Sequence, residues 1–289
     1  MPKIDLHFHS IYSDGKLTVP ELAKLIKERG IKYCSLTDHD TIEGINELKN
    51  ILQGSDITAI PCVELTALYG ANEIHVLAYD FDVNAVDEVL RERFELIKKQ
   101  KIDEMQKAIK LFNQAGIKVT DDILPAEKKP VGYTLAIDIC RQQLNQDLFI
   151  KRHGRILTAD DIYFEYQAPG KSCAVKRSGV SVEWWLTKLK GVVSDFIIAH
   201  PFLQVSVATD PLSENNIFDL LDKGFSGVEV YHEKIPSEKI QWLKKLAVER
   251  KLSYTGGSDS HGNINDLDLG LYGPNLEIPD FIIKNYKSI

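Results

Sequence analysis

The sequence has few cysteines, no long apolar run and no excess of positive charge, and each of these features excludes a class of protein. Its four cysteines are spread along the chain without a CxxC pair, at Cys34, Cys62, Cys140 and Cys173. A disulfide framework is typical of short, cysteine-dense secreted chains, so we expect reduced thiols in the core. No stretch approaches the ~18 uncharged apolar residues of a membrane span, and MPKIDLHFHS has no apolar signal core. We therefore expect a cytoplasmic protein without membrane contact.

The net charge of −7 argues against a protein that coats nucleic acid through a general basic face. The charge is distributed unevenly along the chain. Residues 101–180 contain 13 Lys and Arg against 10 Asp and Glu, a net charge of +3, whereas the remaining residues have a net charge of −10. The length of 289 residues, 44% of them hydrophobic, allows one large domain or two small ones with a sizeable core.

Strand and helix patterns alternate along most of the chain. The run KIDLHFH alternates as a strand does, and in the helix that follows Thr18 and Glu21 form a capping box and Gly30 supplies the stop. We count seven such β–α steps, and this repetition predicts parallel strands. The alternation breaks once, where residues 84–115 predict one long amphipathic helix and a mixed stretch follows. An insertion of about a hundred residues therefore interrupts the pattern.

The histidines follow the strand patterns. Seven of the eight lie in or directly after them, at His7, His9, His39, His75, His200, His232 and His261, and three carboxylates accompany them, Asp14, Glu64 and Asp259. Because the carboxyl ends of parallel barrel strands meet at one rim, these side chains should converge. Imidazoles mixed with carboxylates, without thiolates, suit zinc, manganese or iron. The pattern predicts a multinuclear metal site, whereas His153, in the polar run KRHGR, is expected in a solvated loop.

The motifs that carry these residues are HFHSIYSDG, LTDHDT, the VE of Glu64, the IH of His75, AHP and GSDSH. In identity and order they resemble the motifs of the PHP (polymerase and histidinol phosphatase) superfamily, especially its stand-alone phosphoesterases with an inserted helical domain. The resemblance implies an α/β fold, a distorted seven-stranded (β/α)7 barrel over residues 1–83 and 178–289 with a mostly helical cap domain over 84–177. It also implies a centre of three divalent metal ions (Mn, Zn or Fe).

The resemblance implies nine metal ligands, none of them substituted in this chain. The first metal would be held by His7, His9, Glu64 and Asp259, the second by Glu64, His75 and His200, and the third by Asp14, His39 and His261. Three carboxylates and three divalent ions leave a cationic pocket, for which phosphate is a natural guest. A hydroxide bridging two of the metals would attack phosphorus, so we expect a metal-dependent phosphoric ester hydrolase.

Three polar residues beside the predicted ligands have open roles. His232, in VEVYHE, is a candidate catalytic residue, as a general acid for the leaving oxygen or a contact to the substrate phosphate. Alternatively, it orients a ligand. Asp38 and Asp40 flank His39, and we expect Asp40 to cap the following helix and Asp38 to support a ligand.

The expected substrate follows from the resemblance. The stand-alone relatives are similar to phosphatases of 3′,5′-bisphosphorylated nucleotides or of the 5′ ends of short oligonucleotides, so we expect a small, nucleotide-like phosphate ester. The basic excess of the insertion fits a cap that contacts a second phosphate, with Lys176 and Arg177 as candidate substrate-binding residues, or else a solvated basic surface. Two positions depart from the family pattern, since AHPFLQ lacks an Arg common soon after AHP and Thr134 stands where a His is common.

Three other functions stay open as alternatives: a histidinol-phosphate phosphatase, a non-catalytic metal-stabilised module of a larger assembly, and an amidohydrolase. The insertion argues against the first and the complete ligand set against the second. His75, in place of the lysine expected in the fourth strand, argues against the third. We expect no obligate protein partner.

Overall fold

The structure is a computed structural model that describes residues 3–70, 72–126, 129–205, 210–264, 266, 268–274 and 276–279. The chain forms two compact units, one of Met1–Arg91 with Val180–Ile289 and the other of Glu92–Gly179. The long helix α3 (Val83–Gln114) begins in the first unit and ends in the second.

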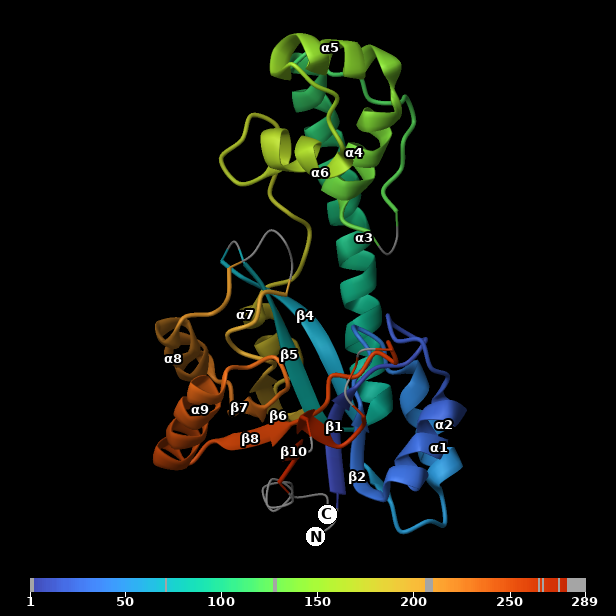
Figure 1. The fold of residues 1–289 in the computed structure, drawn as a ribbon, viewed down its shortest axis with the longest axis vertical. Coiled ribbons are helices and arrows are strands. Elements are labelled where there is room, and N and C mark those ends of the chain that lie inside the picture. Colours follow the sequence, from blue (N-terminus) through green and yellow to red (C-terminus); the bar gives the residue numbers. More distant parts are fainter. Residues whose placement is uncertain are drawn as a thin grey trace. The chain divides into compact units, whose positions relative to one another are not determined.

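The first unit is built from strands with helices packed against them (Figure 1). Its strands are β1 (Lys3–Phe8), β2 (Ile31–Leu36), β3 (Thr58–Ala59), β4 (Cys62–Tyr69), β5 (Asn72–Phe81), β6 (Val193–Ile198), β7 (Gly227–Tyr231), β8 (Ser253–Gly256), β9 (Leu271–Gly273) and β10 (Leu276–Glu277). Its helices, besides the start of α3, are α1 (Val19–Arg29), α2 (Glu43–Leu52), α7 (Val182–Lys188), α8 (Glu214–Lys223) and α9 (Ser237–Arg250). Helices α1 and α2 pack on β2, and α9 packs on β7 and β8.

Two main sheets carry the unit, with strand orders β1-β2-β3 and β4-β5-β6-β7-β8. Pairing is parallel in the first sheet and between β6, β7 and β8, but β5 runs antiparallel to both β4 and β6. The cause is the short connection, because only positions 70 and 71 separate β4 from β5, and a crossover to a parallel strand needs a dozen or more residues. The prediction of parallel strands throughout is therefore wrong for β5.

A closed seven-stranded barrel is not found in the part of the chain that the structure describes. The two main sheets are separate ladders, and isolated bridges join them between Phe8 and Ser260 and between His39 and Glu64. The pairing of β1 with β2 is irregular between Asp5 and Phe8, which interrupts regular hydrogen bonding on that side. The observed architecture is a mixed α/β fold whose two sheets meet beside the predicted ligands.

Helix α1 has the ends that the sequence predicts. The Thr18 hydroxyl accepts a hydrogen bond from the backbone N–H of Glu21 at 3.4 Å, and the Glu21 carboxylate accepts one from the Thr18 N–H at 2.8 Å. Gly30 ends the helix in the left-handed conformation, with φ 69°. On the inner face Leu22 is buried in the core that α1 shares with β1 and β2. The helix thereby anchors the loop that carries Asp14.

The second unit is helical and has its own core. After α3 come α4 (Val131–Arg141), α5 (Gln143–His153), α6 (Ala159–Ile162) and the π-helical turn η1 (Tyr163–Gln167). The predicted helix over 84–115 is confirmed to within one residue at each end. On α3, Met105, Ala108 and Phe112 recur at helical spacing and are buried together with residues of α4 and α5.

Two expectations from composition can be compared with the structure. All four cysteines are free thiols, and Cys34, Cys62 and Cys173 are buried. Among the described residues, no helix is both long enough and apolar enough to cross a membrane.

Candidate metal centre

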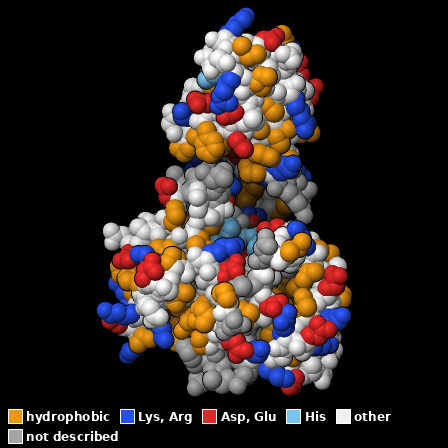
Figure 2. Space-filling model, viewed as in Figure 1, with side chains coloured by type: hydrophobic (Ala, Val, Ile, Leu, Met, Phe, Trp, Pro, Cys, Tyr) orange, Lys and Arg blue, Asp and Glu red, His pale blue; other side chains and the backbone are white. Residues whose placement is uncertain are grey.

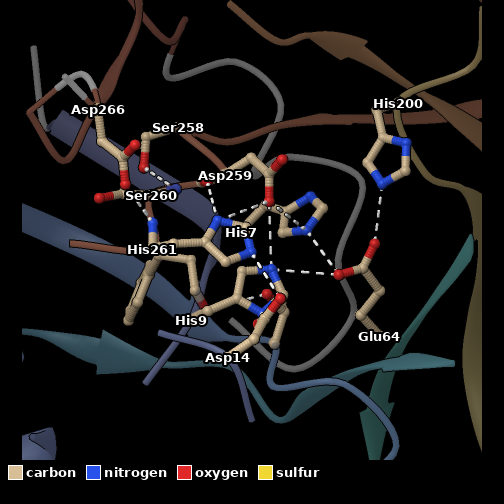
Figure 3. Close-up of polar contacts among 12 residues, drawn as sticks. His7, His9, Asp14, Glu64, His200, Ser258, Asp259, Ser260, His261 and Asp266 are labelled. Carbon is tan, nitrogen blue, oxygen red and sulfur yellow. Dashed lines mark hydrogen bonds and ion pairs between the residues drawn. The ribbon is translucent and has the colours of Figure 1, made fainter. Parts of the chain in front are cut away.

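The nine predicted ligands all belong to the first unit, and Figure 3 shows most of them pointing toward one another. They sit in or just after strands: His7 in β1, His9 and Asp14 after it, His39 after β2, Glu64 in β4, His75 in β5, His200 after β6, and Asp259 and His261 after β8. Residues far apart in the sequence are thus brought to one place by strand ends and by the β4–β5 hairpin.

The Glu64 carboxylate lies at the centre of the first group. Its Oε2 is 3.2 Å from His7 Nε2 and 3.1 Å from His9 Nε2. Asp259 Oδ1 closes the group, 3.4 Å from His7 Nε2 and 3.2 Å from His9 Nε2. The ligand atoms of these four side chains lie within 4.8 Å of one another, which would allow them to hold one ion. They are the same four side chains that the resemblance assigns to the first metal.

The other oxygen of Glu64 faces a second set of imidazoles. Oε1 is 3.0 Å from His75 Nδ1 and 2.9 Å from His200 Nε2, and these two nitrogens are 3.3 Å apart. His39 also reaches this place, because its Nδ1 is 3.3 Å from Glu64 Oε2 and it forms a compact group with Glu64 and His75. The resemblance assigns His200 to the second metal, and the structure places both His200 and His39 against the carboxylate.

A third group surrounds Asp14, in the loop between β1 and α1. Asp14 Oδ2 is 3.3 Å from His261 Nε2 and 3.7 Å from His39 Nε2, while Oδ1 is 3.6 Å from His9 Nδ1. His9 therefore belongs to two groups, with one ring nitrogen toward Asp14 and the other toward Glu64. The three groups form one continuous cluster.

Exposure to solvent changes steeply across the cluster. The side chains of His7 and His9 are fully buried, those of His39 and His261 are about a fifth exposed, and that of Asp14 is 54% exposed. A cavity of about 330 Å³ opens here, lined by Asp14, His39, Glu64, His75, His200, Leu203, Gln204, Val205, Lys234, Asp259 and His261. Figure 2 shows histidine side chains at the surface of the first unit.

The buried charges compensate one another. Burial raises the pKa of Glu64, but the imidazoles of His39, His7 and His75 outweigh it and hold the pKa well below its usual range. Burial lowers the pKa of His9, but the adjacent carboxylates of Asp259 and Glu64 prevail and raise it to about 9. In His39 burial prevails and lowers the pKa to about 4. The imidazoles whose pKa is raised, such as His9, therefore offset the negative charge of the carboxylates at neutral pH, whereas His39 is neutral there.

The residues fit divalent metal ions. Both ring nitrogens of His9 and Nδ1 of His39 are buried without a hydrogen-bond partner among the described residues. A buried polar atom without a partner costs about 1–3 kcal/mol, so several in one cluster favour nitrogens that ligate a metal. Imidazole and carboxylate donors without thiolate suit zinc, manganese or iron.

Comparison with known proteins agrees with this geometry. A family model described as the PHP domain matches residues 5–168, which is more than half of the chain. The chain belongs to the PHP domain family. The match begins in β1 and includes the clustered residues that lie in or after β1, after β2, and in β4 and β5.

Relatives of this PHP protein extend over nearly its whole length. It is 26% identical over 289 residues to a 5'-3' exoribonuclease of Haemophilus influenzae, covering 99% of this chain and 98% of the relative. It is 25% identical over 265 residues to a 3',5'-nucleoside bisphosphate phosphatase of Chromobacterium violaceum, covering 90% of this chain and 88% of the relative. A solved structure from Bifidobacterium adolescentis, assigned as a metal-dependent phosphoesterase, shares the fold with a TM-score of 0.62 at 20% identity, over 98% of this chain and 94% of the other.

Behind the predicted ligands of the PHP protein lies Glu229, which the sequence analysis missed. It is fully buried in the middle of β7. Its Oε1 is 2.9 Å from His7 Nδ1, and its Oε2 accepts a hydrogen bond from the backbone N–H of His200 at 2.7 Å. A carboxylate that holds the far nitrogen of a ligating histidine fixes the orientation of the ring. The available signal was an acidic residue between the two valines of GVEVY, a run otherwise without charge.

Two further carboxylates hold the loops of the site. Asp38 accepts hydrogen bonds from the backbone N–H of Ser10 at 2.8 Å and from the hydroxyl groups of Ser10 and Ser13, which fixes the loop that carries Asp14. The prediction that Asp38 supports a ligand agrees with these contacts. Asp5 is buried beneath the site and accepts N–H groups of Ser258 and of two other residues. It thereby ties β1 to the segment after β8.

His232 is fully buried and contacts Asp259 rather than the cavity. Its Nε2 is 3.1 Å from Asp259 Oδ2, and its Nδ1 accepts a hydrogen bond from the backbone N–H of Lys234 at 3.1 Å. Because Nδ1 is the acceptor, the proton lies on Nε2 and is donated to Asp259. These contacts are those of the second alternative, a residue that orients a ligand.

The remaining predicted residues lie elsewhere. Lys176, which is exposed, and Arg177, which is half-buried, belong to the second unit, and their role stays a prediction. Asp40 does not cap α2, because it adopts φ 54° and accepts a hydrogen bond from the Thr66 N–H at 2.9 Å instead. His153 is the last residue of α5, not a loop residue, and its Nε2 is 2.8 Å from the Tyr166 hydroxyl.

Proposed function

We propose that this PHP protein hydrolyses phosphate esters of nucleotide-like substrates at three divalent ions held by the nine predicted ligands. As a member of its family it is a metal-dependent hydrolase of phosphate esters. The observation that carries the finer proposal is the Glu64 carboxylate, whose Oε2 contacts His7 and His9 while its Oε1 contacts His75 and His200. One carboxylate with its two oxygens in different groups is suited to bridge two ions.

The protein's part in the chemistry is to hold the ions and admit the phosphate. Bound divalent ions polarise phosphoryl oxygens and lower the pKa of water, which supplies a nucleophile near neutral pH. His7 and His9 are fully buried, whereas Asp14 is 54% exposed. The ester therefore enters from the side of Asp14, and the fully buried group stays shielded from bulk water.

His232 acts in this scheme as a positioning residue. It donates Nε2–H to Asp259 Oδ2, which leaves Asp259 Oδ1 directed toward the His7 and His9 nitrogens. A buried imidazole whose proton is already engaged by a ligand is poorly placed to protonate a leaving group. Its substitution should therefore act through metal binding.

The relatives support a nucleotide or RNA end as the substrate, since one is named an exoribonuclease and another a nucleoside bisphosphate phosphatase. In this proposal the ester is either a 3′,5′-bisphosphorylated nucleotide or the 5′-phosphorylated end of a short oligonucleotide. Lys176 and Arg177 of the second unit remain candidates for contact with the substrate.

The test is phosphate and nucleotide release with manganese added. The panel comprises adenosine 3′,5′-bisphosphate, 5′-AMP, 3′-AMP, histidinol phosphate and a 5′-phosphorylated trinucleotide. Asp259→Asn serves as the inactive blank, and Asp222→Asn as the matched control, because Asp222 is 77% exposed on α8. We expect turnover of nucleotide esters by the wild type and the control and at least a hundredfold less by the blank. Turnover of histidinol phosphate alone would overturn the substrate class, and equal activity of the blank would overturn the site.

A further inference from the structure

The wall of the metal cavity contains residues that belong to no predicted ligand set. They are Leu203, Gln204 and Val205 in the loop after β6, and Lys234 in the loop after β7. Because β6 and β7 are parallel neighbours, both loops leave the same edge of the sheet. Among the described residues that line the cavity, Lys234 carries the only permanent positive charge.

The backbone of Lys234 is fixed to the metal cluster while its side chain remains in solvent. Its N–H donates to His232 Nδ1 at 3.1 Å, and His232 in turn holds Asp259. The side chain is 60% exposed, and its ion pair within the described part of the chain is with Glu233, at 3.8 Å. A hydrated ammonium on a flexible stem, anchored at its base, is well suited to meet an anionic group.

The loop after β6, which forms another part of the wall, is held in a strained conformation. His200 has φ 25° and Phe202 has φ 74°, which are unfavourable values for residues with a Cβ. The Phe202 ring is held by Lys239, whose Nζ is 4.6 Å from the ring centroid, and by Trp242, with ring centroids 5.7 Å apart. Gln204, a neutral amide in this loop, adds no charge to the wall, so its permanent positive charge among the described lining residues comes from Lys234.

We propose that Lys234 binds a second phosphoryl group of the substrate, next to the one that is hydrolysed. This inference rests on the proposed function. The charge of the scissile phosphate would be offset by the ions that the nine ligand side chains hold, whereas Lys234 is joined to those side chains indirectly, through its backbone N–H and His232. A cavity of about 330 Å³ is at the small end of ligand sites, so it admits the phosphorylated end of a molecule and little more.

The second phosphoryl group has two possible sources. It is the free phosphate of a bisphosphorylated nucleotide, or the first phosphodiester of a 5′-phosphorylated oligonucleotide. Both place one further anionic phosphorus centre beside the scissile ester, and Lys234 would bind either by a charge-assisted hydrogen bond.

The experiment compares Lys234→Ala, Lys234→Arg and the control Lys245→Ala on adenosine 3′,5′-bisphosphate, 5′-AMP and a 5′-phosphorylated trinucleotide. Lys245 is 73% exposed on α9, so the control removes the same charge from the same unit. Initial rates give kcat and KM, calorimetric titration gives Kd for the bisphosphate and for 5′-AMP, and elemental analysis gives metal content. We expect Lys234→Ala to lose about 10–100-fold in kcat/KM on the doubly phosphorylated substrates, mainly through KM, and about threefold or less on 5′-AMP. Lys234→Arg should recover most of the loss.

The outcomes distinguish the two sources of the second phosphate, and they distinguish failure of the Lys234 role from failure of the proposed function. A selective loss on the bisphosphate identifies a free phosphate as the group bound, and a selective loss on the trinucleotide identifies a phosphodiester. Equal losses on all three substrates, or no loss on any, overturn the role of Lys234. If the wild type hydrolyses none of the three substrates, the proposed function fails. The role of Lys234 is then decided by binding alone, that is, by whether Lys234→Ala weakens the Kd for the bisphosphate more than the Kd for 5′-AMP.

Discussion

Replacing Glu229 by glutamine should weaken metal binding without changing a single predicted ligand. Glu229 is fully buried in β7 and holds two elements of the site, the ring of His7 through Oε1 and the backbone N–H of His200 through Oε2. Burial raises the pKa of Glu229, but His7 and then His232 outweigh it, and the net pKa is lowered, so the residue is a carboxylate at neutral pH.

The expected loss of stability and metal affinity in Glu229→Gln follows from counting hydrogen-bond donors and acceptors. The His200 N–H is a donor, and His7 Nδ1 must also be a donor when Nε2 ligates a cation. Glutamine offers one acceptor oxygen and one NH₂ group, so one of the two partners would face another donor. A buried donor without an acceptor costs about 1–3 kcal/mol. Loss of a carboxylate that holds a ligating histidine lowers metal affinity by about 10–100-fold, which corresponds to about 1.4–2.8 kcal/mol.

The assay measures manganese or zinc affinity by competition with a chromophoric chelator, together with the urea unfolding midpoint of the metal-free protein. Glu249→Gln is the matched control, because Glu249 is 61% exposed on α9. We expect a 10–100-fold weaker Kd for Glu229→Gln and wild-type values for Glu249→Gln. Wild-type affinity and an unchanged unfolding midpoint in Glu229→Gln would refute the role assigned to the carboxylate.

Four further predictions concern other parts of the molecule. Burial raises the pKa of Asp5 from 3.8 to about 6, so its contribution to stability is present below about pH 4 and is lost as the pH rises through 6. Asp5→Asn does not titrate, so between these pH values its unfolding free energy in urea should rise relative to that of the wild type by on the order of 2–3 kcal/mol. A difference that does not change with pH would contradict this. His232→Gln, which can still donate to Asp259, should retain more metal and activity than His232→Ala, and loss of one limb of the pH–rate profile in both variants would instead indicate a general acid. Chelation of the metals should lower Tm by roughly 5–10 °C, since ligand at a hundred times Kd stabilises by about 2.7 kcal/mol, and an unchanged melting curve would argue against ions at this site. Phe112→Ala, in the core of the second unit, should cost about 3–5 kcal/mol in circular-dichroism melts while metal content stays at the wild-type value; a coupled loss of metal would show that the site depends on that core.

The clustering of the predicted ligands follows from strand ends, which periodicity locates well. His7 and His9, two residues apart at the end of β1, contact the same Glu64 oxygen, as their spacing suggests. The motif order added the remaining partners, since sequence spacing alone cannot say that Asp14 meets His261.

The direction of β5 was not predicted, although the sequence contained the signal. Counting β–α steps treats each strand pattern as following a helix, but Tyr69 and Asn72 pair directly across positions 70 and 71. His75 therefore lies opposite Thr66 in the middle of a hairpin and reaches Glu64 from the neighbouring strand. A connection this short excludes a helix, and connection length is the better guide at that point.

The residues behind the ligands were the least predictable. Glu229 and Asp5 act through buried contacts with residues distant in sequence, and neither belongs to a pattern that periodicity detects. Asp40 illustrates a competing effect, because a residue type suited to cap a helix adopts a left-handed conformation instead and bonds to β4. In each case a tertiary contact, which local sequence cannot specify, sets the role of the residue.

The long sequence separation of the metal cluster has a consequence for synthesis in the cell. His7 and its partner Glu229 are 222 positions apart, and Asp14 contacts His261, which follows β8. Contacts between residues so far apart in the sequence form slowly, and on the ribosome the early histidines emerge long before their partners have been synthesised. A nascent chain therefore exposes HFH and the His39 segment early, and loading of metal at the predicted ligands would have to wait until nearly the whole chain has been made.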